Sequence, residues 1–300
     1  MRVFVTGASG WIGSHTVPHL IAAGHDVVGL GYSDDSARRV EALGATVHRG
    51  GLDDLESLRA GAKGADAVVH LAFKHDFDDY VGAGRVERAA VETFVDELAG
   101  SGRALLLASG LVGTPGVTMT ENDRSLFSGP DAPRGGSEGL ALEAADRGVR
   151  SVALRFSATV HGVGDHGFTA VLTQIARERG VSGYVGDGSG RWPAVHVDDA
   201  GRLVALAVDK APAGSAVHAV AEEGVPSREI AEAIGRAVGV PAVSVDPADA
   251  ADHFGWLSRF WGMDAVASSA ITRERLGWEP VGPTLVEDIA AGAYDHAARG

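Results

Sequence analysis

Residues 3–15, VFVTGASGWIGSH, decide the fold of this 300-residue chain. They read as a short strand, then Gly7, Gly10 and Gly13 at three-residue spacing, then the start of a helix. In such a unit the first glycine permits the tight turn, the second lets a pyrophosphate approach the backbone, and the third lets helix and strand pack closely. The N–H groups at the helix start favour an anion. The stretch therefore predicts a dinucleotide site; the alternative is a structural turn with incidental glycines.

Short apolar runs alternate with helical patterns through the first half of the chain, which is typical of βαβ units and a parallel sheet. Strands are expected at 2–6, 26–30, 46–49, 66–72, 104–109 and 151–156. Helices are expected at 11–23, 36–43, 53–60, 85–99 and 137–147, and later at 168–180, 197–209 and 227–238. The fold class is α/β, a Rossmann-like doubly wound parallel sheet with a smaller, mostly helical C-terminal substrate lobe. Its dinucleotide-binding domain is expected at 1–156 and the lobe mainly at 157–300, with sheet contributions from about 157–220.

The composition excludes several classes of protein. Apolar residues make up 45% of the chain, enough for a sizeable core, and the formal net charge of −14 repels a phosphate backbone, so nucleic acid is not an expected partner. No apolar run reaches the roughly 18 residues that span a bilayer, and a strand starts at once, so neither a membrane nor a signal peptide is expected and the chain is placed in the cytoplasm. The absence of Cys excludes disulfides and thiol catalysis.

Four segments carry a family resemblance when they are taken in order. TGASGWIG begins at Thr6, and VVHLA (68–72), VHVDDAG (195–201) and LGWEP (276–280) follow. Together they resemble the short-chain dehydrogenase/reductase superfamily, in its extended, epimerase/dehydratase-like branch, over nearly the whole chain. The resemblance implies an NAD or NADP coenzyme. The residues expected to contact it are Gly7, Ser9, Gly10, Trp11, Ile12, Gly13, Tyr32, Ser33, Arg38, Leu52, Asp53, Leu71, Ala72 and Phe73.

The choice between NAD and NADP is expected at the end of the second strand, where an acid binds the ribose hydroxyls and a basic residue accommodates a 2′-phosphate. The sequence there is GLGYSDDSARR (29–39), with no acid at the strand end itself. Ser33 with Arg38 or Arg39 suits a phosphate, while Asp34 or Asp35 suits a plain ribose. The pattern slightly favours NADP.

The adenine contacts depart from the pattern of the branch. Tyr32 stands where relatives often have Arg, so it is expected to pack on the adenine. Gly51 stands where relatives tend to have Asp, which leaves Leu52 and Asp53 as the expected adenine neighbours.

The proton-transfer pair of the superfamily is missing. Its reductases are expected to use a Ser and a Tyr-x-x-x-Lys pair, but alignment of the helix before the strand at 151–156 places Arg134 at the Tyr position and Glu138 at the Lys position. Arg stays protonated and is a poor acid, and Glu raises the pKa of a neighbouring acid. Two interpretations stay open. The two residues form an i,i+4 ion pair, or Arg134 binds a carboxylate or carbonyl of the substrate.

Other residues are candidates for the remaining roles. Ser109 ends the fifth strand near the expected catalytic Ser, although a Ser before Gly also simply begins a turn. His75 is the main candidate for a replacement acid, ahead of His161 and His166 in what reads as a loop. None of the four tyrosines, which are Tyr32, Tyr80, Tyr184 and Tyr294, is followed by Lys four residues later.

The later aromatic residues are assigned by their surroundings. Trp192 is expected in a loop on the wall of the substrate cleft. The other aromatic residues are expected in the core of the C-terminal lobe; they are Phe254, Trp256, Phe260 and Trp261. The segment HGVGDH (161–166) has no second cluster of ligands beside it, so no metal site is expected.

The expected function is an NAD(P)-dependent oxidoreductase of atypical extended type that acts on a small carbonyl or alcohol, with a small molecule as its partner. The rivals are a non-catalytic NAD(P)-binding redox sensor and an epimerase or dehydratase that retains tightly bound NAD. The resemblance also implies a homodimer formed through the helices at 85–99 and 137–147, unless packing on the chain's own sheet uses the apolar face of the first.

Overall fold

A seven-stranded parallel sheet organises the larger part of the molecule. The computed structural model describes residues 1–74, 79–111 and 113–295. The order across the sheet is β10-β6-β5-β4-β1-β2-β3, and every neighbouring pair is parallel. The strands are β1 (Arg2–Thr6), β2 (Asp26–Gly31), β3 (Thr46–Arg49), β4 (Ala67–His70), β5 (Ala104–Gly110), β6 (Arg150–Phe156) and β10 (Ser215–Ala219). The six strands expected in the first half are confirmed. β10 was not predicted as a strand, although it lies within the residues 157–220 that were expected to contribute to the sheet.

Helices cover both faces of this sheet. Along β1, Val3 and Val5 are buried in one core with residues of α1 (Trp11–Ala22) and α7 (Val197–Lys210). Phe4 is buried in a second core with residues of α3 (Leu55–Lys63) and α4 (Tyr80–Leu98). This alternation is the period-2 geometry of a strand with two covered faces. The elements around the sheet are α1 (Trp11–Ala22), α2 (Asp34–Ala42), α3 (Leu55–Lys63), α4 (Tyr80–Leu98), η1 (Pro133–Gly136), α5 (Ser137–Glu143), η2 (Ala144–Arg147), α7 (Val197–Lys210) and α10 (Ala270–Leu276). The fold class is therefore the expected one.

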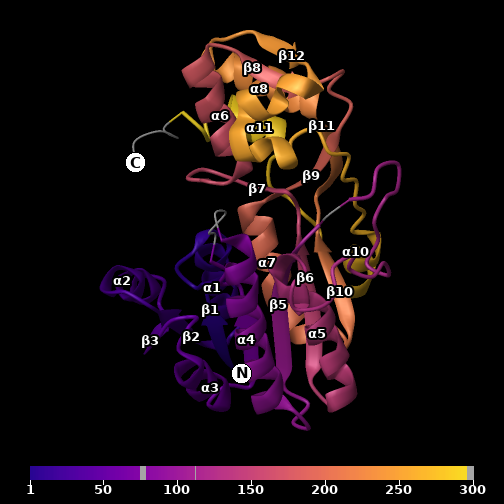
Figure 1. The fold of residues 1–300 in the computed structure, drawn as a ribbon. Helices are drawn as coiled ribbons and strands as arrows, with labels where there is room; N and C mark the ends of the chain where they lie inside the picture. Colours follow the sequence, from indigo (N-terminus) through magenta and orange to yellow (C-terminus); the bar gives the residue numbers. More distant parts are fainter. Residues whose placement is uncertain (75–78, 112, 296–300) are drawn as a thin grey trace.

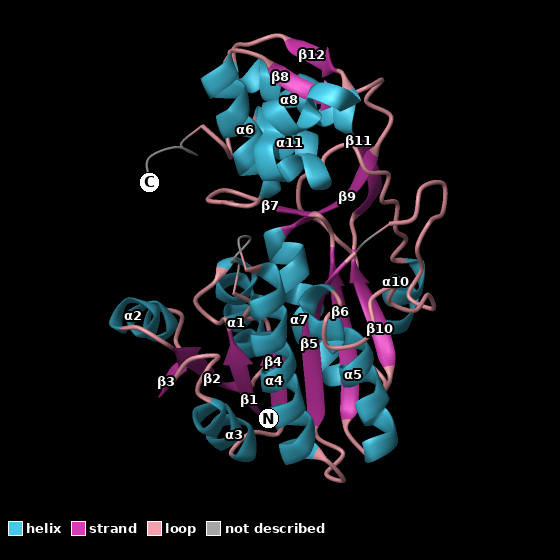
Figure 2. Ribbon diagram, viewed as in Figure 1, coloured by secondary structure: helices cyan, strands magenta, loops and turns pink. Residues whose placement is uncertain are grey.

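A smaller lobe lies beyond the carboxyl ends of the strands (Figure 1). It holds its own core, together with two small sheets that the sequence pattern did not predict (Figure 2). Its strands are β7 (Thr159–His161), β8 (Ser182–Val185), β9 (Arg191–His196), β11 (Glu222–Pro226) and β12 (Ala242–Val245). Its helices are α6 (Phe168–Arg179), α8 (Ser227–Val238), η3 (Pro247–Asp249), α9 (Ala250–Phe254), η4 (Gly255–Arg259) and α11 (Leu285–Ala290).

The chain returns to the sheet after it has entered the smaller lobe. α7 packs on α1, and β10 pairs with β6 at the sheet edge. Trp278, in the LGWEP segment, is fully buried in the core shared with β1 and α7, and its indole nitrogen donates to the Asp199 carbonyl at 3.0 Å. Trp278, near the C-terminus, therefore packs in the same core as Val3 and Val5 of β1.

The long helix α4 uses its apolar face within the chain. Ala90, Phe94 and Leu98 are buried against the sheet, in one core with residues of α3 and α5. Homodimer formation through this helix stays a prediction. Across the described part of the chain, no helix combines the length and the apolar character needed to cross a membrane.

Trp278→Ala should lower the free energy of unfolding by about 3–5 kcal/mol, because it empties a fully buried site and leaves the Asp199 carbonyl without its donor. Trp256→Ala is the matched control, since that side chain is 37% exposed and should cost much less. Urea unfolding of both variants measures the difference, and equal losses would contradict the packing described here.

Candidate nucleotide-binding and active site

The turn between β1 and α1 has the geometry of a diphosphate cradle. A Cβ on Gly7, whose φ is +69°, would lie 2.7 Å from the Ala72 nitrogen, and one on Gly13 would lie 2.0 Å from the Gly7 carbonyl oxygen. Gly10 differs, because a Cβ there would meet only that same oxygen, at 3.2 Å. Gly10 caps α1 without any side-chain hydrogen bond, and no acidic residue lies in the first turn. The residues present thus fit a bound anion at the helix start.

The adenosine end of the predicted site carries several charges. The Ser33 hydroxyl accepts from the Ser36 backbone in a capping box at the start of α2, so it already serves its own helix. Arg38 lies 3.5 Å from Asp35, and Arg49, which the sequence analysis missed, pairs with Asp34. Arg49 could have been found from its place at the end of β3, next to the end of β2 in the parallel sheet.

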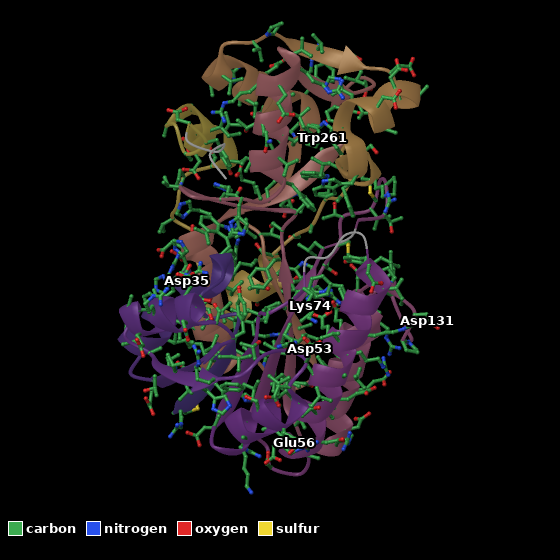
Figure 3. The ribbon with its side chains drawn as sticks, turned by 60° about the vertical axis from the view of Figure 1, so that its left-hand side comes forward. Asp35, Asp53, Glu56, Lys74, Asp131 and Trp261 are labelled. Atoms are coloured by element: carbon green, nitrogen blue, oxygen red, sulfur yellow. The ribbon has the colours of Figure 1, made fainter. Side chains whose placement is uncertain are left out.

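Two loops meet beside this end of the cradle. Lys74, after β4, forms an ion pair of 2.7 Å with Asp53, after β3 (Figure 3). Asp53 was predicted as an adenine neighbour without this partner, because the two residues follow strands that are not neighbours in the sheet. Tyr32 is 73% exposed, and Leu52 is half-buried. Their predicted adenine contacts stay predictions.

Arg134 does not pair with Glu138. Its Nε donates to Glu87 of α4 at 3.0 Å, a second nitrogen of the same guanidinium also donates to Glu87, and the guanidinium carbon lies 4.6 Å from the centre of the Phe73 ring. The expected i,i+4 ion pair is wrong, because Arg134 lies in η1 with φ +54° and not on the helix that carries Glu138. Arg134 therefore sits over the end of β4, next to the cradle.

Glu138 turns inward to β6. Its carboxylate accepts from Arg155 at 2.7 and 3.1 Å, and both side chains are buried. Arg155 also donates to the carbonyl of Asp123 at 2.7 Å, so it ties the segment after β5 to the sheet. The position expected for a catalytic Lys thus holds one half of a buried structural ion pair.

Ser109 lies where the sequence places it, near the carboxyl end of β5 and partly buried, in register with Arg155 of β6. His75 lies outside the described residues. His70, in β4, is fully buried and hydrogen-bonds the Thr6 hydroxyl at 2.6 Å. Burial, with a smaller contribution from the Arg134 charge, lowers the pKa of His70 to about 3, so it is neutral at physiological pH.

The second lobe touches the cradle through Trp11. Its indole nitrogen donates to the Val160 carbonyl at 2.7 Å, and its ring meets His166 edge-on at 6.1 Å. His161 is not in a loop as expected. It belongs to β7, is fully buried, and its Nδ1 lies 2.8 Å from a carboxylate oxygen of Asp288. Burial therefore makes His161 a structural residue.

Trp192 is lobe core and not a cleft wall. It belongs to β9, is 3% exposed, and packs edge-on against Trp261 at 4.8 Å. A loop was the wrong prediction, because Trp192 begins the continuous buried run of four residues in β9. The core assignment is right for Phe254 and Trp261, which are buried, whereas Trp256 and Phe260 stay partly exposed.

A cavity of about 490 Å³ opens between the segment after β5 and the second lobe. Pro115 lines it from one side, and Arg191, Met263 and Asp264 line it from the other. Arg191 donates to both carboxylate oxygens of Asp264, at 2.7 and 2.8 Å, so the charges on this wall are paired.

Comparison with known proteins gives the family. Residues 3–86 match the NAD dependent epimerase/dehydratase family, which is the part of the chain that contains the cradle. A protein of Schizosaccharomyces pombe, described only as uncharacterized, is 44% identical over 98% of this chain and 100% of its own length. The chain belongs to the NAD-dependent epimerase/dehydratase family.

Two other relatives of this family member carry named activities. A 2-alkyl-3-oxoalkanoate reductase of Stenotrophomonas maltophilia is 28% identical over 81% of this chain and 77% of the reductase. The structure of Thermus thermophilus UDP-glucose 4-epimerase in complex with NAD superposes with a TM-score of 0.71 over 99% of both chains, at 22% identity. At that identity the likeness shows the fold alone.

Glu138→Lys should destabilise this family member by about 3–5 kcal/mol or prevent folding, because it places an ammonium against the buried Arg155 guanidinium. Glu143→Lys is the matched control, since Glu143 is exposed on the same helix. Thermal unfolding compares the two, and a stable Glu138→Lys protein would contradict the structural role of the pair.

Proposed function

We propose that the protein is an NAD(P)-dependent oxidoreductase that reduces a small carbonyl compound or oxidises the corresponding alcohol. The observation that carries the proposal is the uncapped glycine turn of α1 beside Phe73 and Arg134 at the carboxyl edge of the sheet. Ligands of open α/β sheets bind at this edge. Similarity to a reductase over most of both chains supports oxidoreduction.

Each part of the site has a separate task. The backbone of Gly7, Gly10 and Gly13 would hold the diphosphate, and the coenzyme supplies or accepts hydride when bound. Ser109, near the end of β5, would orient the substrate oxygen by a hydrogen bond.

NADP is the coenzyme that we propose. Arg38 and Arg39 lie on α2, and Arg49 is the last residue of β3. Their three guanidinium groups pair with two carboxylates, those of Asp34 and Asp35. β2 ends without an acidic residue that would reject a 2′-phosphate. The surplus of positive charge favours NADP.

A redox sensor is the second candidate, and the buried Glu138–Arg155 pair favours it. Glu138, which stands at the position expected for the Lys of the proton-transfer pair, is instead held in a structural ion pair. Tight coenzyme binding without turnover of any carbonyl compound would establish the sensor, and nucleotide that stays bound through purification would instead indicate an epimerase or dehydratase. Titration of the purified protein with NADH and NADPH, followed by a screen of carbonyl compounds for NAD(P)H consumption, separates the three.

Gly10→Val should weaken NADPH binding at least tenfold, about 1.4 kcal/mol. The reason is that the side chain would stand where a diphosphate approaches the backbone, whereas on the protein side its Cβ meets one atom, the Gly7 carbonyl oxygen, in a tight contact of 3.2 Å that the turn must yield slightly to accept. Gly64→Ala, at the far end of α3, is the control and should bind like the wild type. Calorimetry measures both, and unchanged affinity in Gly10→Val would refute the cradle.

A further inference from the structure

Arg134 is held in a backbone conformation that needs support. It is the one non-glycine residue with positive φ in the described ranges, and Gly135 and Gly136 after it are also left-handed. Such a conformation is strained and persists only where surrounding contacts enforce it. Here the contacts come from α4, because Glu87 binds the side chain of Arg134 and Arg88 donates to the Gly135 carbonyl at 2.9 Å.

One face of α4 receives this turn. Tyr80, Gly84 and Glu87 share that face, since residues four and seven apart lie on the same side of a helix. A Cβ on Gly84 would lie 2.7 Å from the Gly135 nitrogen, so the glycine lets η1 approach α4 closely. Arg134 therefore crosses α4 at Gly84, with Glu87 along the helix in one direction and Tyr80 in the other.

Phe73 joins this group to the cradle. The Tyr80 ring packs edge-on against the Phe73 ring, with centroids 5.7 Å apart, and the Arg134 guanidinium lies over the same ring. The residue before Phe73, Ala72, donates to the Thr6 hydroxyl at 3.3 Å, and its nitrogen is the atom nearest to a Cβ on Gly7. A phenol, a guanidinium and the cradle thus share one edge of the sheet.

Two opposing effects act on the Tyr80 phenol. Burial is the larger and raises the pKa of Tyr80, so the phenol is protonated at neutral pH but is a weaker acid than a free tyrosine. The charge of Arg134 acts in the opposite direction and exceeds the opposing effect of Glu87, so a cation is in place to stabilise the phenolate.

We propose that Tyr80 is the proton donor of this enzyme and that Arg134 stabilises its phenolate, so that the two replace the Tyr-x-x-x-Lys pair that the chain lacks. The inference rests on the oxidoreductase function proposed above. A bound reduced nicotinamide coenzyme would supply hydride to the carbonyl carbon and be oxidised, and the electron pair of the C=O π bond would move to oxygen. The O–H bond of Tyr80 breaks, its proton completes the alcohol, and a solvent proton restores the phenol.

Kinetics on the full chain test the donor. With the most active carbonyl compound of the screen, Tyr80→Phe should lower kcat about 10²–10⁴-fold and leave the NADPH dissociation constant unchanged. Tyr184→Phe is the matched control, because Tyr184 also lies under a guanidinium, that of Arg228 at 5.2 Å, but in the second lobe. Wild-type kcat in Tyr80→Phe would overturn the proposal.

A second measurement needs neither coenzyme nor turnover. The four tyrosines are replaced by fluorotyrosine, whose phenol is more acidic than that of tyrosine, and Tyr80→Phe assigns the resonance of Tyr80 in fluorine NMR spectra. The double variant Arg134→Gln/Glu87→Gln, which strands no buried charge, should raise the pKa of this phenol. An unchanged pKa would overturn the pairing with Arg134. If no carbonyl compound is reduced, the oxidoreductase function fails, and this titration still decides the pairing separately.

Discussion

The structure depends on the close approach of backbone to backbone at the turn between β1 and α1. Neither Gly7 nor Gly13 has room for a side chain, because Ala72 of the neighbouring strand end and the Gly7 carbonyl fill the space. This contact fixes the angle at which α1 leaves the sheet and brings Ala72 and Phe73 next to the helix start. The same contact therefore builds the cradle and places the residues after β4 beside it.

Two carboxylates then decide what the rest of the site becomes. Glu138 from α5 neutralises Arg155 inside the protein, and Glu87 from α4 holds Arg134 at the rim. Buried charges are tolerated only in such pairs, since an unpaired one is costly. The first pair fixes the segment after β5, and the second brings a cation to Phe73 and Tyr80. This edge of the sheet thus carries a phenol and a guanidinium, and none of the four tyrosines of the chain is followed by Lys four residues later.

The second lobe is connected to the cradle and not simply placed above it. Trp11, the first residue of α1, donates to Val160, and the neighbouring His161 is locked by Asp288 from α11. These contacts link α11 to β7, and β7 to the start of α1. The position of the lobe is therefore fixed directly at the predicted diphosphate site, which is where a bound dinucleotide would be enclosed.

The sequence by itself determined the parallel sheet, most helices around it and the glycine turn, because these depend on local spacing and on apolar periods within short segments. The five small strands β7, β8, β9, β11 and β12 were missed, since their pairing depends on partners far along the chain. Only the tertiary structure decided the partners of Arg134, Glu138 and His161. A charge pairs with whatever the fold brings nearest, and Glu87, Arg155 and Asp288 come from elements that no spacing rule connects to them.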